Sequence, residues 1–148
     1  MPRIPASKLK ELLVSPGHVG AADFAKAIEE AESAHRQLED VLVEDSYVTE
    51  EHLGKTIADG YELPYIDLRT IAIPEEIITL LQEVVARAQQ AVVFERAGDT
   101  IKLATSNNDY FELAKNLERK IQCRVEVYYA TPRSIEEALT YYRGDLQK

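Results

Sequence analysis

The histidines and the cysteine are the side chains best suited to metal binding or nucleophilic chemistry. The sequence holds three histidines, His18, His35 and His52, and one cysteine, Cys123. The histidines are not at metal-ligand spacing with one another, and a single cysteine forms neither an internal disulfide nor a multi-cysteine metal site. We therefore expect exposed histidines, a Cys123 that packs as a small apolar residue, and no metal centre.

Carboxylates are concentrated in the first part of the chain. The formal net charge is −9, and residues 1–60 hold six basic and twelve acidic side chains. Within the run Glu29-Glu30-Ala31-Glu32, successive helical residues point in different directions, which favours a solvated face over a cation site. A surface this acidic repels phosphate backbones and anionic membrane surfaces, so we expect no nucleic acid partner. Glu29, Glu30 and Glu32 are either a solubilising face or a binding surface for a basic protein.

The sequence contains no recognisable catalytic motif. It has neither the G-x-x-x-x-G-K-[ST] loop that cradles ATP phosphates nor a G-x-G-x-x-G turn after a strand. No stretch approaches the roughly 20 apolar residues of a membrane span, and the N-terminus lacks a signal peptide's apolar core. Together with the single cysteine, these features predict a cytoplasmic, non-enzymatic chain without direct membrane insertion and without a cofactor.

An internal repeat organises the elements that carry these side chains. The apolar positions Leu9, Leu13, Val14, Val19, Phe24 and Ile28 recur 29 residues later as Leu38, Leu42, Val43, Val48, Leu53 and Ile57. Such self-similarity marks a duplicated supersecondary unit. Each copy predicts a short helix, a tight turn at Gly17 or Ser46, and a longer helix capped by Gly20 or Thr49. Since neither copy can bury its apolar face alone, we expect one helical bundle over residues 1–62.

The pattern changes at Leu63-Pro64. Residues 65–68 predict a strand, and Pro74 opens a helix through about Gln89. Residues 91–96 and 100–105 predict a hairpin around Gly98, residues 107–109 cap a helix through about Ile121, and a strand at 124–129 precedes a final helix from Pro132. This is the βαββαβ order of a ferredoxin-like fold plus one helix. We therefore predict an α+β chain, with a duplicated helical subdomain at 1–62 and a small α/β subdomain at 63–148.

The two repeats, the segment Leu63-Pro64-Tyr65-Ile66-Asp67-Leu68 and the segment Ala104-Thr105-Ser106-Asn107 resemble a known arrangement. They are similar to the N-terminal domain of type II secretion and type IV pilus assembly ATPases, and the similarity runs from about Lys8 to Arg143. In that family the domain precedes a separate motor module that carries the P-loop. The resemblance thus implies a non-catalytic piece of a longer ATPase.

Some members of this family bind cyclic di-GMP through the duplicated unit, each copy typically starting with Arg-Leu-Gly, turning at Gly and ending at Gln. The matching positions here are Lys8, Lys10, Gly17 and Ala31 in the first copy and Gln37, Glu39, Ser46 and Gly60 in the second. Only Gly17 keeps the family's residue. Lys8 and Gln37 lack the planar guanidinium, and the side chains of Lys10 and Glu39 fill space where backbone would approach the ligand. Neither copy ends in a residue that can donate and accept at a base edge.

Two functions follow from the resemblance. The first is an interaction domain that docks its own motor domain to the cytoplasmic part of an inner-membrane platform protein, and so lies in the cytoplasm, peripheral to the inner membrane. The alternative is a cyclic di-GMP receptor that controls the same motor. The departures at the frame positions favour the first, and we expect weak cyclic di-GMP binding or none.

Overall fold

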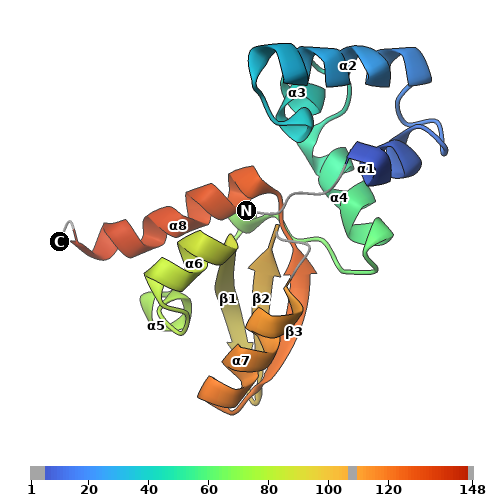
Figure 1. The fold of residues 1–148 in the computed structure, drawn as a ribbon. Helices are drawn as coiled ribbons and strands as arrows, with labels where there is room; N and C mark the ends of the chain where they lie inside the picture. Colours follow the sequence, from blue (N-terminus) through green and yellow to red (C-terminus); the bar gives the residue numbers. More distant parts are fainter. Residues whose placement is uncertain (1–5, 107–109, 147–148) are drawn as a thin grey trace.

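The structure, a computed structural model, describes residues 6–106 and 110–146, with side chains described up to Tyr142. The predicted cap at residues 107–109 lies outside this range. Four helices precede a mixed α/β half (Figure 1): α1 Ala6–Leu13, α2 Ala21–Ala34, α3 Leu38–Glu44 and α4 Glu50–Gly60. We call residues 6–62 the helical half and residues 63–146 the α/β half.

The helices of the helical half follow the predicted order of short, long, short and long. Both predicted N-caps are present, Gly20 before α2 and Thr49 before α4. The Thr49 hydroxyl accepts a hydrogen bond from the backbone N–H of His52, satisfying one free donor of the first turn of α4. Each short helix packs on a long one: α1 contacts α4, and α2 contacts α3.

One hydrophobic core fills the helical half. The buried side chains that form it include Leu9, Leu13, Val19, Phe24, Leu42, Leu53 and Ile57. These belong to the apolar positions of the repeat, so the period-29 pattern identified the core. Val14, Ile28, Leu38, Val43 and Val48 are partly buried and pack against it.

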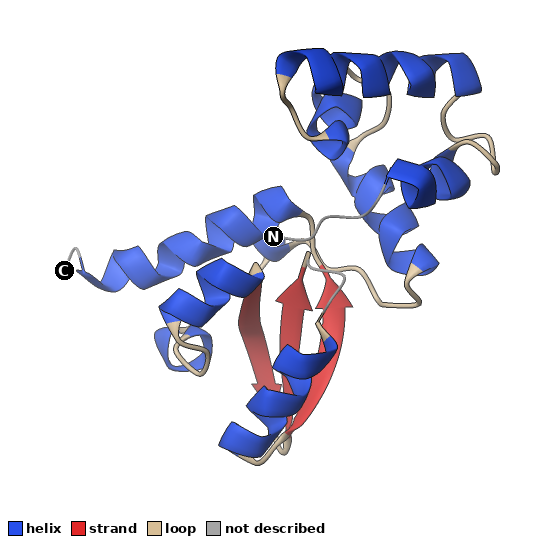
Figure 2. Cartoon of the chain, in the orientation of Figure 1, coloured by secondary structure: helices blue, strands red, loops and turns tan. Residues whose placement is uncertain are grey.

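A three-stranded sheet lies at the centre of the α/β half (Figure 2). Its strands are β1 Ala91–Ala97, β2 Thr100–Thr105 and β3 Arg124–Tyr129, in the order β1-β2-β3. β1 and β2 form the predicted antiparallel hairpin, with Gly98 at φ 60° in its turn, and β2 pairs with β3 in parallel. The accompanying helices are η1 Leu68–Thr70, α5 Glu75–Ile78, α6 Glu83–Gln89, α7 Phe111–Ile121 and α8 Pro132–Leu146.

The strand predicted at 65–68 forms only one isolated bridge. Tyr65 pairs with Tyr129 beside β3, after which the chain turns away from the sheet. The Asp67 carboxylate accepts a hydrogen bond from the backbone N–H of Arg69, and this local turn leads into η1. The fold is α+β as predicted, but the described sheet has three strands with a parallel pair, so the ferredoxin-like βαββαβ order is not found in full.

The single helix predicted for 74–89 is two helices, α5 and α6. The carbonyls of Ile78 and Leu81 at the break lie 2.9 and 2.6 Å from the buried hydroxyl of Tyr142. The single proton of this hydroxyl is donated to the two carbonyls, so it partly offsets the helical hydrogen bonding lost at the break. The β-branched run Ile77-Ile78-Thr79 has low helix propensity, so tertiary contacts decide the local structure.

A second hydrophobic core lies in the α/β half. The sheet and helices bury Val92, Ile101, Leu103, Ile135 and Leu139, among others. Within the described residues, no helix combines the length and the apolar character needed to cross a membrane.

Candidate functional site

The two turns of the repeat have the same backbone geometry. Gly17 and Ser46 are both left-handed, with φ values of 89° and 65°. Their N–H groups donate to the carbonyls of Val14 and Val43, at 3.0 and 3.2 Å. The next hydrogen bond is also shared, since Val19 and Val48 donate to the carbonyls of Leu13 and Leu42. The matched frame positions 17 and 46 are therefore structurally equivalent.

The start of the first frame lies beside the end of the second. The Lys8 ammonium is 5.8 Å from the centre of the Tyr61 ring, which follows Gly60 at the end of α4. A Cβ at Gly60 would come within 2.6 Å of the Leu12 side chain of α1. The space beside position 60 is thus filled by a leucine, and a glutamine there would require Leu12 to move.

The remaining frame positions lie in different surroundings. Lys10 is exposed on α1, and Gln37 is exposed at the N-cap of α3. Ala31 is buried in the core of the helical half. Glu39 is buried, with 7 % of its surface exposed, and lines a small cavity with Thr131 and Pro132 of the α/β half. Glu39 therefore faces the junction between the halves.

All three histidines are exposed, as predicted, and two of them contact each other. His18 and His52 are exposed, but the turn after α1 brings His18 Nδ1 to 2.9 Å from His52 Nε2 on α4. His35 is exposed at the C-cap of α2. Cys123 is half-buried, with its Sγ 3.6 Å from an Arg96 guanidinium nitrogen. Among the residues that the structure covers, no group of three or more His, Cys, Asp or Glu side chains could hold a metal ion.

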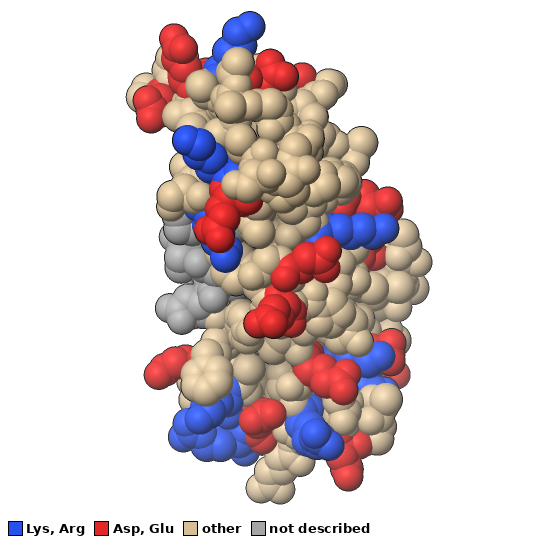
Figure 3. All heavy atoms as spheres, turned by 90° about the vertical axis from the view of Figure 1, so that its right-hand side faces the viewer, with Lys and Arg blue, Asp and Glu red and all other residues tan. Residues whose placement is uncertain are grey.

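The acidic run lies on the outside of α2. Glu29, Glu30 and Glu32 are all exposed. Glu30 lies 4.0 Å from Arg36, which also contacts Glu44 and Asp45, and hydrogen bonding with Asp45 raises the pKa of Glu30. Within the described ranges, no ion pair engages Glu29 or Glu32. Acidic and basic side chains alternate over the face in Figure 3, and a basic group lies at its lower end.

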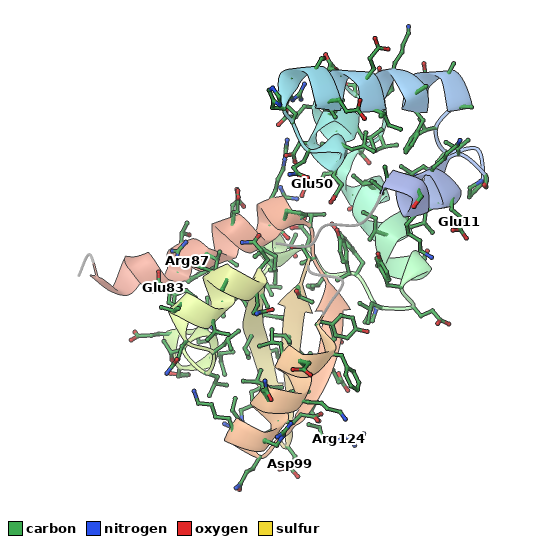
Figure 4. The ribbon with its side chains drawn as sticks, viewed as in Figure 1. Glu11, Glu50, Glu83, Arg87, Asp99 and Arg124 are labelled. Carbon is green, nitrogen blue, oxygen red and sulfur yellow. The ribbon has the colours of Figure 1, made fainter. Side chains whose placement is uncertain are left out.

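Glu50 joins the two halves. It lies in the first turn of α4, and its side chain is 15 % exposed. Arg69 donates to both of its carboxylate oxygens, at 3.2 and 2.6 Å, and the Thr131 hydroxyl donates to Oε2 at 2.7 Å. The hydrogen bond to Asp67 raises the pKa of Arg69, partial burial opposes this, and the hydrogen bond to Glu50 raises the pKa further. Arg69 therefore stays charged, and the contact is a bidentate, charge-assisted pair. Figure 4 labels Glu50, which lies where the helical half meets the α/β half.

The face of α4 one turn further on also contacts the α/β half. A Cβ at Gly54 would lie 2.5 Å from the Tyr65 ring and 3.0 Å from the Thr131 methyl, so only glycine allows this approach. Burial raises the pKa of Tyr65 to about 12, which keeps the phenol neutral. Tyr129, at the end of β3, is buried in the core of the helical half, and Arg133 of α8 pairs with Glu44 of α3. Helix α4 is therefore shared between the helical core and the junction.

Sequence reasoning missed the junction residues Glu50, Gly54, Arg69 and Thr131. Their types carry no motif, and only the glycine inside a predicted helix gave a signal, since such a glycine often marks close packing. The buried state of Glu39 was not predicted either.

The comparisons with known proteins converge on one family. Residues 61–147 match the MshEN domain. A structure of MshE with cdg, an abbreviation for cyclic di-GMP, aligns with a TM-score of 0.68 and 30 % identity, covering 90 % of this chain and 97 % of that one. The N-terminal domain of XpsE aligns at 16 % identity with a TM-score of 0.57, covering 94 % of this chain and 96 % of that one, which shows the fold alone. No curated protein sequence matches the chain significantly.

These matches and the architecture agree with the resemblance predicted from the repeat and the Leu63–Leu68 segment. The chain belongs to the MshEN domain family, the N-terminal domains of type II secretion and type IV pilus assembly ATPases.

Proposed function

We propose that the chain is a non-catalytic interaction domain that docks a secretion or pilus motor to the cytoplasmic part of an inner-membrane platform protein. This interaction domain consists of a duplicated helical subdomain at 1–62 and an α/β subdomain at 63–148. It acts in the cytoplasm at the inner membrane. The observation that carries the proposal is the acidic face of α2, where Glu29 and Glu32 are exposed and take part in no ion pair within the described ranges. A basic partner would relieve the repulsion among these carboxylates and accelerate association.

Association kinetics with a purified cytoplasmic platform fragment test this proposal. The association rate is expected to fall as salt rises, because exposed charges are screened over about 8–10 Å near physiological ionic strength. Glu29→Lys/Glu32→Lys should slow association without lowering the melting temperature. The matched control is Glu126→Lys/Glu136→Lys, which makes the same charge change at exposed positions of the α/β half. A rate that responds equally to both double variants would overturn the acidic face as the docking surface.

Cyclic di-GMP regulation is the second candidate, favoured by the similarity to the structure of MshE with cdg. The filled space beside Gly60 and the burial of Glu39 at the junction oppose a site at the frame positions. Titration calorimetry with cyclic di-GMP is expected to give no saturable heat at micromolar concentrations. Saturable binding that is lost in Lys8→Ala/Gln37→Ala would establish the receptor function instead.

A further inference from the structure

Two of the three histidines meet on the surface of the helical half. His18 Nδ1 lies 2.9 Å from His52 Nε2, and the ring centres are 4.5 Å apart with the ring planes at 70°. Both side chains are exposed, so an ion from solution reaches them directly. The two residues lie 34 positions apart, which matches no metal-binding spacing, so the sequence predicted no metal centre. The pair forms only when the turn after α1 packs beside α4.

The backbone holds both imidazoles in place. In the turn after α1, the buried Val19 beside His18 donates its N–H to the carbonyl of Leu13 at 3.0 Å. On α4, the N–H of His52 donates to the Thr49 hydroxyl at 3.1 Å. Helix α1 also contacts α4. The two rings are thus brought together before any ligand binds, and preorganised groups lose less entropy on binding.

The separation of the two nitrogens fits a single transition-metal ion. Imidazole nitrogens bind such ions at about 2.0–2.1 Å, so two of them at right angles around the ion lie about 2.9 Å apart. This equals the distance between His18 Nδ1 and His52 Nε2. At the tetrahedral angle that Zn²⁺ prefers, they would lie about 3.4 Å apart. Right angles are typical of tetragonal Cu²⁺ and Ni²⁺ sites, and imidazole suits both ions.

The protons of the pair allow both nitrogens to act as ligands. A neutral imidazole carries its hydrogen on one ring nitrogen and leaves the other free to accept. With the hydrogens on His18 Nε2 and His52 Nδ1, the two facing nitrogens are both free. Rotation of the exposed rings then aims both lone pairs at one ion, and water fills its other coordination positions. The number of protons on the neutral pair does not change.

We propose that His18 and His52 chelate one Cu²⁺ or Ni²⁺ ion on the surface of the helical half. The ion links the turn of the first repeat copy to α4 in the second copy, and so strengthens the packing of the two copies. The site uses none of the acidic side chains of α2 and is independent of the docking function proposed above.

Titration calorimetry of the full, untagged chain with NiCl₂ tests the proposal, at about pH 7.5 where free imidazole is neutral. One ion per chain is expected. His18→Asn and His52→Asn should each weaken Ni²⁺ binding about tenfold or more, because a chelate becomes a single ligand. Ni²⁺ should also raise the melting temperature of the unmodified chain, since only the folded state brings the two rings together. The electron paramagnetic resonance spectrum of the chain with Cu²⁺ should show two coordinated nitrogens.

The matched control is His35→Asn. His35 is exposed and has a left-handed backbone, with φ 53°, which asparagine tolerates. This variant should bind Ni²⁺ as the unmodified chain does, and Mg²⁺, which prefers oxygen ligands, should give no binding heat. Full affinity in His18→Asn or His52→Asn, an equal loss in His35→Asn, or no Ni²⁺ binding at all would overturn the proposal. Tighter binding of Zn²⁺ than of Ni²⁺ would contradict the right-angled geometry.

Discussion

Gly17 and Ser46, which lie 29 residues apart, adopt the same left-handed backbone and make equivalent hydrogen bonds to Val14 and Val43. The same turn is thus built once with glycine and once with a residue that carries a Cβ. Because the left-handed region costs a non-glycine residue about 1–2 kcal/mol, the second turn is the more strained of the two.

Ser46→Gly is expected to raise the free energy of unfolding by about 0.5–1 kcal/mol. Glycine relieves the left-handed strain, and this gain exceeds the loss caused by the greater entropy of the unfolded chain. Gly17→Ser should lower it by a similar amount. A Cβ at Gly17 meets no atom within 4 Å, so the loss reports the backbone alone. Urea unfolding of both variants measures the effects, and a destabilised Ser46→Gly would contradict the equivalence of the turns.

The contact between Glu50 and Arg69 should be energetically significant. A double-mutant cycle with Glu50→Gln and Arg69→Met is expected to give a coupling of about 1–3 kcal/mol, typical of hydrogen bonds to charged groups. We expect the lower end of this range, because the Arg69 side chain is 34 % exposed and water screens part of the interaction.

Glu51 and Lys55 provide the matched control for this cycle. They form an i,i+4 pair on the same helix, 3.5 Å apart and mostly exposed. Their coupling should stay below about 0.5 kcal/mol. Equal couplings for the two pairs would show that the junction contributes nothing beyond a surface ion pair.

The helical half could be predicted because its information is local and periodic. Spacing placed Phe24 and Leu53 in the core, and cap residues such as Thr49 set the helix ends. The hairpin at Gly98 followed from turn chemistry for the same reason. Each of these features depends on residues close in sequence, so a single chain is enough to identify it.

The break between α5 and α6 and the junction could not be predicted in this way. The break depends on Tyr142, more than 60 positions away, and Glu50 meets Thr131 across 81 positions. Contacts between distant segments leave no period in the sequence. The repeat placed positions 17 and 46 in equivalent turns. The burial of Glu39 depends on the α/β half, so the repeat alone could not predict it.

Gly54→Ala is expected to destabilise the protein by about 1–3 kcal/mol, the usual cost of overpacking. The sign is diagnostic, because the same change in an exposed helix normally stabilises by up to about 1 kcal/mol. In a Tyr65→Ala background most of the penalty should vanish, since the ring 2.5 Å from the added Cβ is gone. Chemical unfolding of the two single variants and the double variant measures this. A stabilised Gly54→Ala would contradict the close packing of α4 on Tyr65.

Tyr142 should make stability depend on alkaline pH. Burial raises its pKa from 10 to about 12 in the folded protein. Below pH 10 its phenol is neutral in both states, and its contribution is fully present. Between pH 10 and about 12 the unfolded chain ionises while the folded chain retains its proton, so stability falls as pH rises.

Tyr142→Phe should cost about 1–3 kcal/mol below pH 10, because the carbonyls at the helix break lose their hydroxyl partner. It should also flatten the alkaline decline in urea-unfolding free energy, leaving the part contributed by Tyr65. Tyr141→Phe, at a more exposed position, is the control and should leave the slope unchanged. An identical decline in Tyr142→Phe and the unmodified chain would show that Tyr142 is not held neutral by burial.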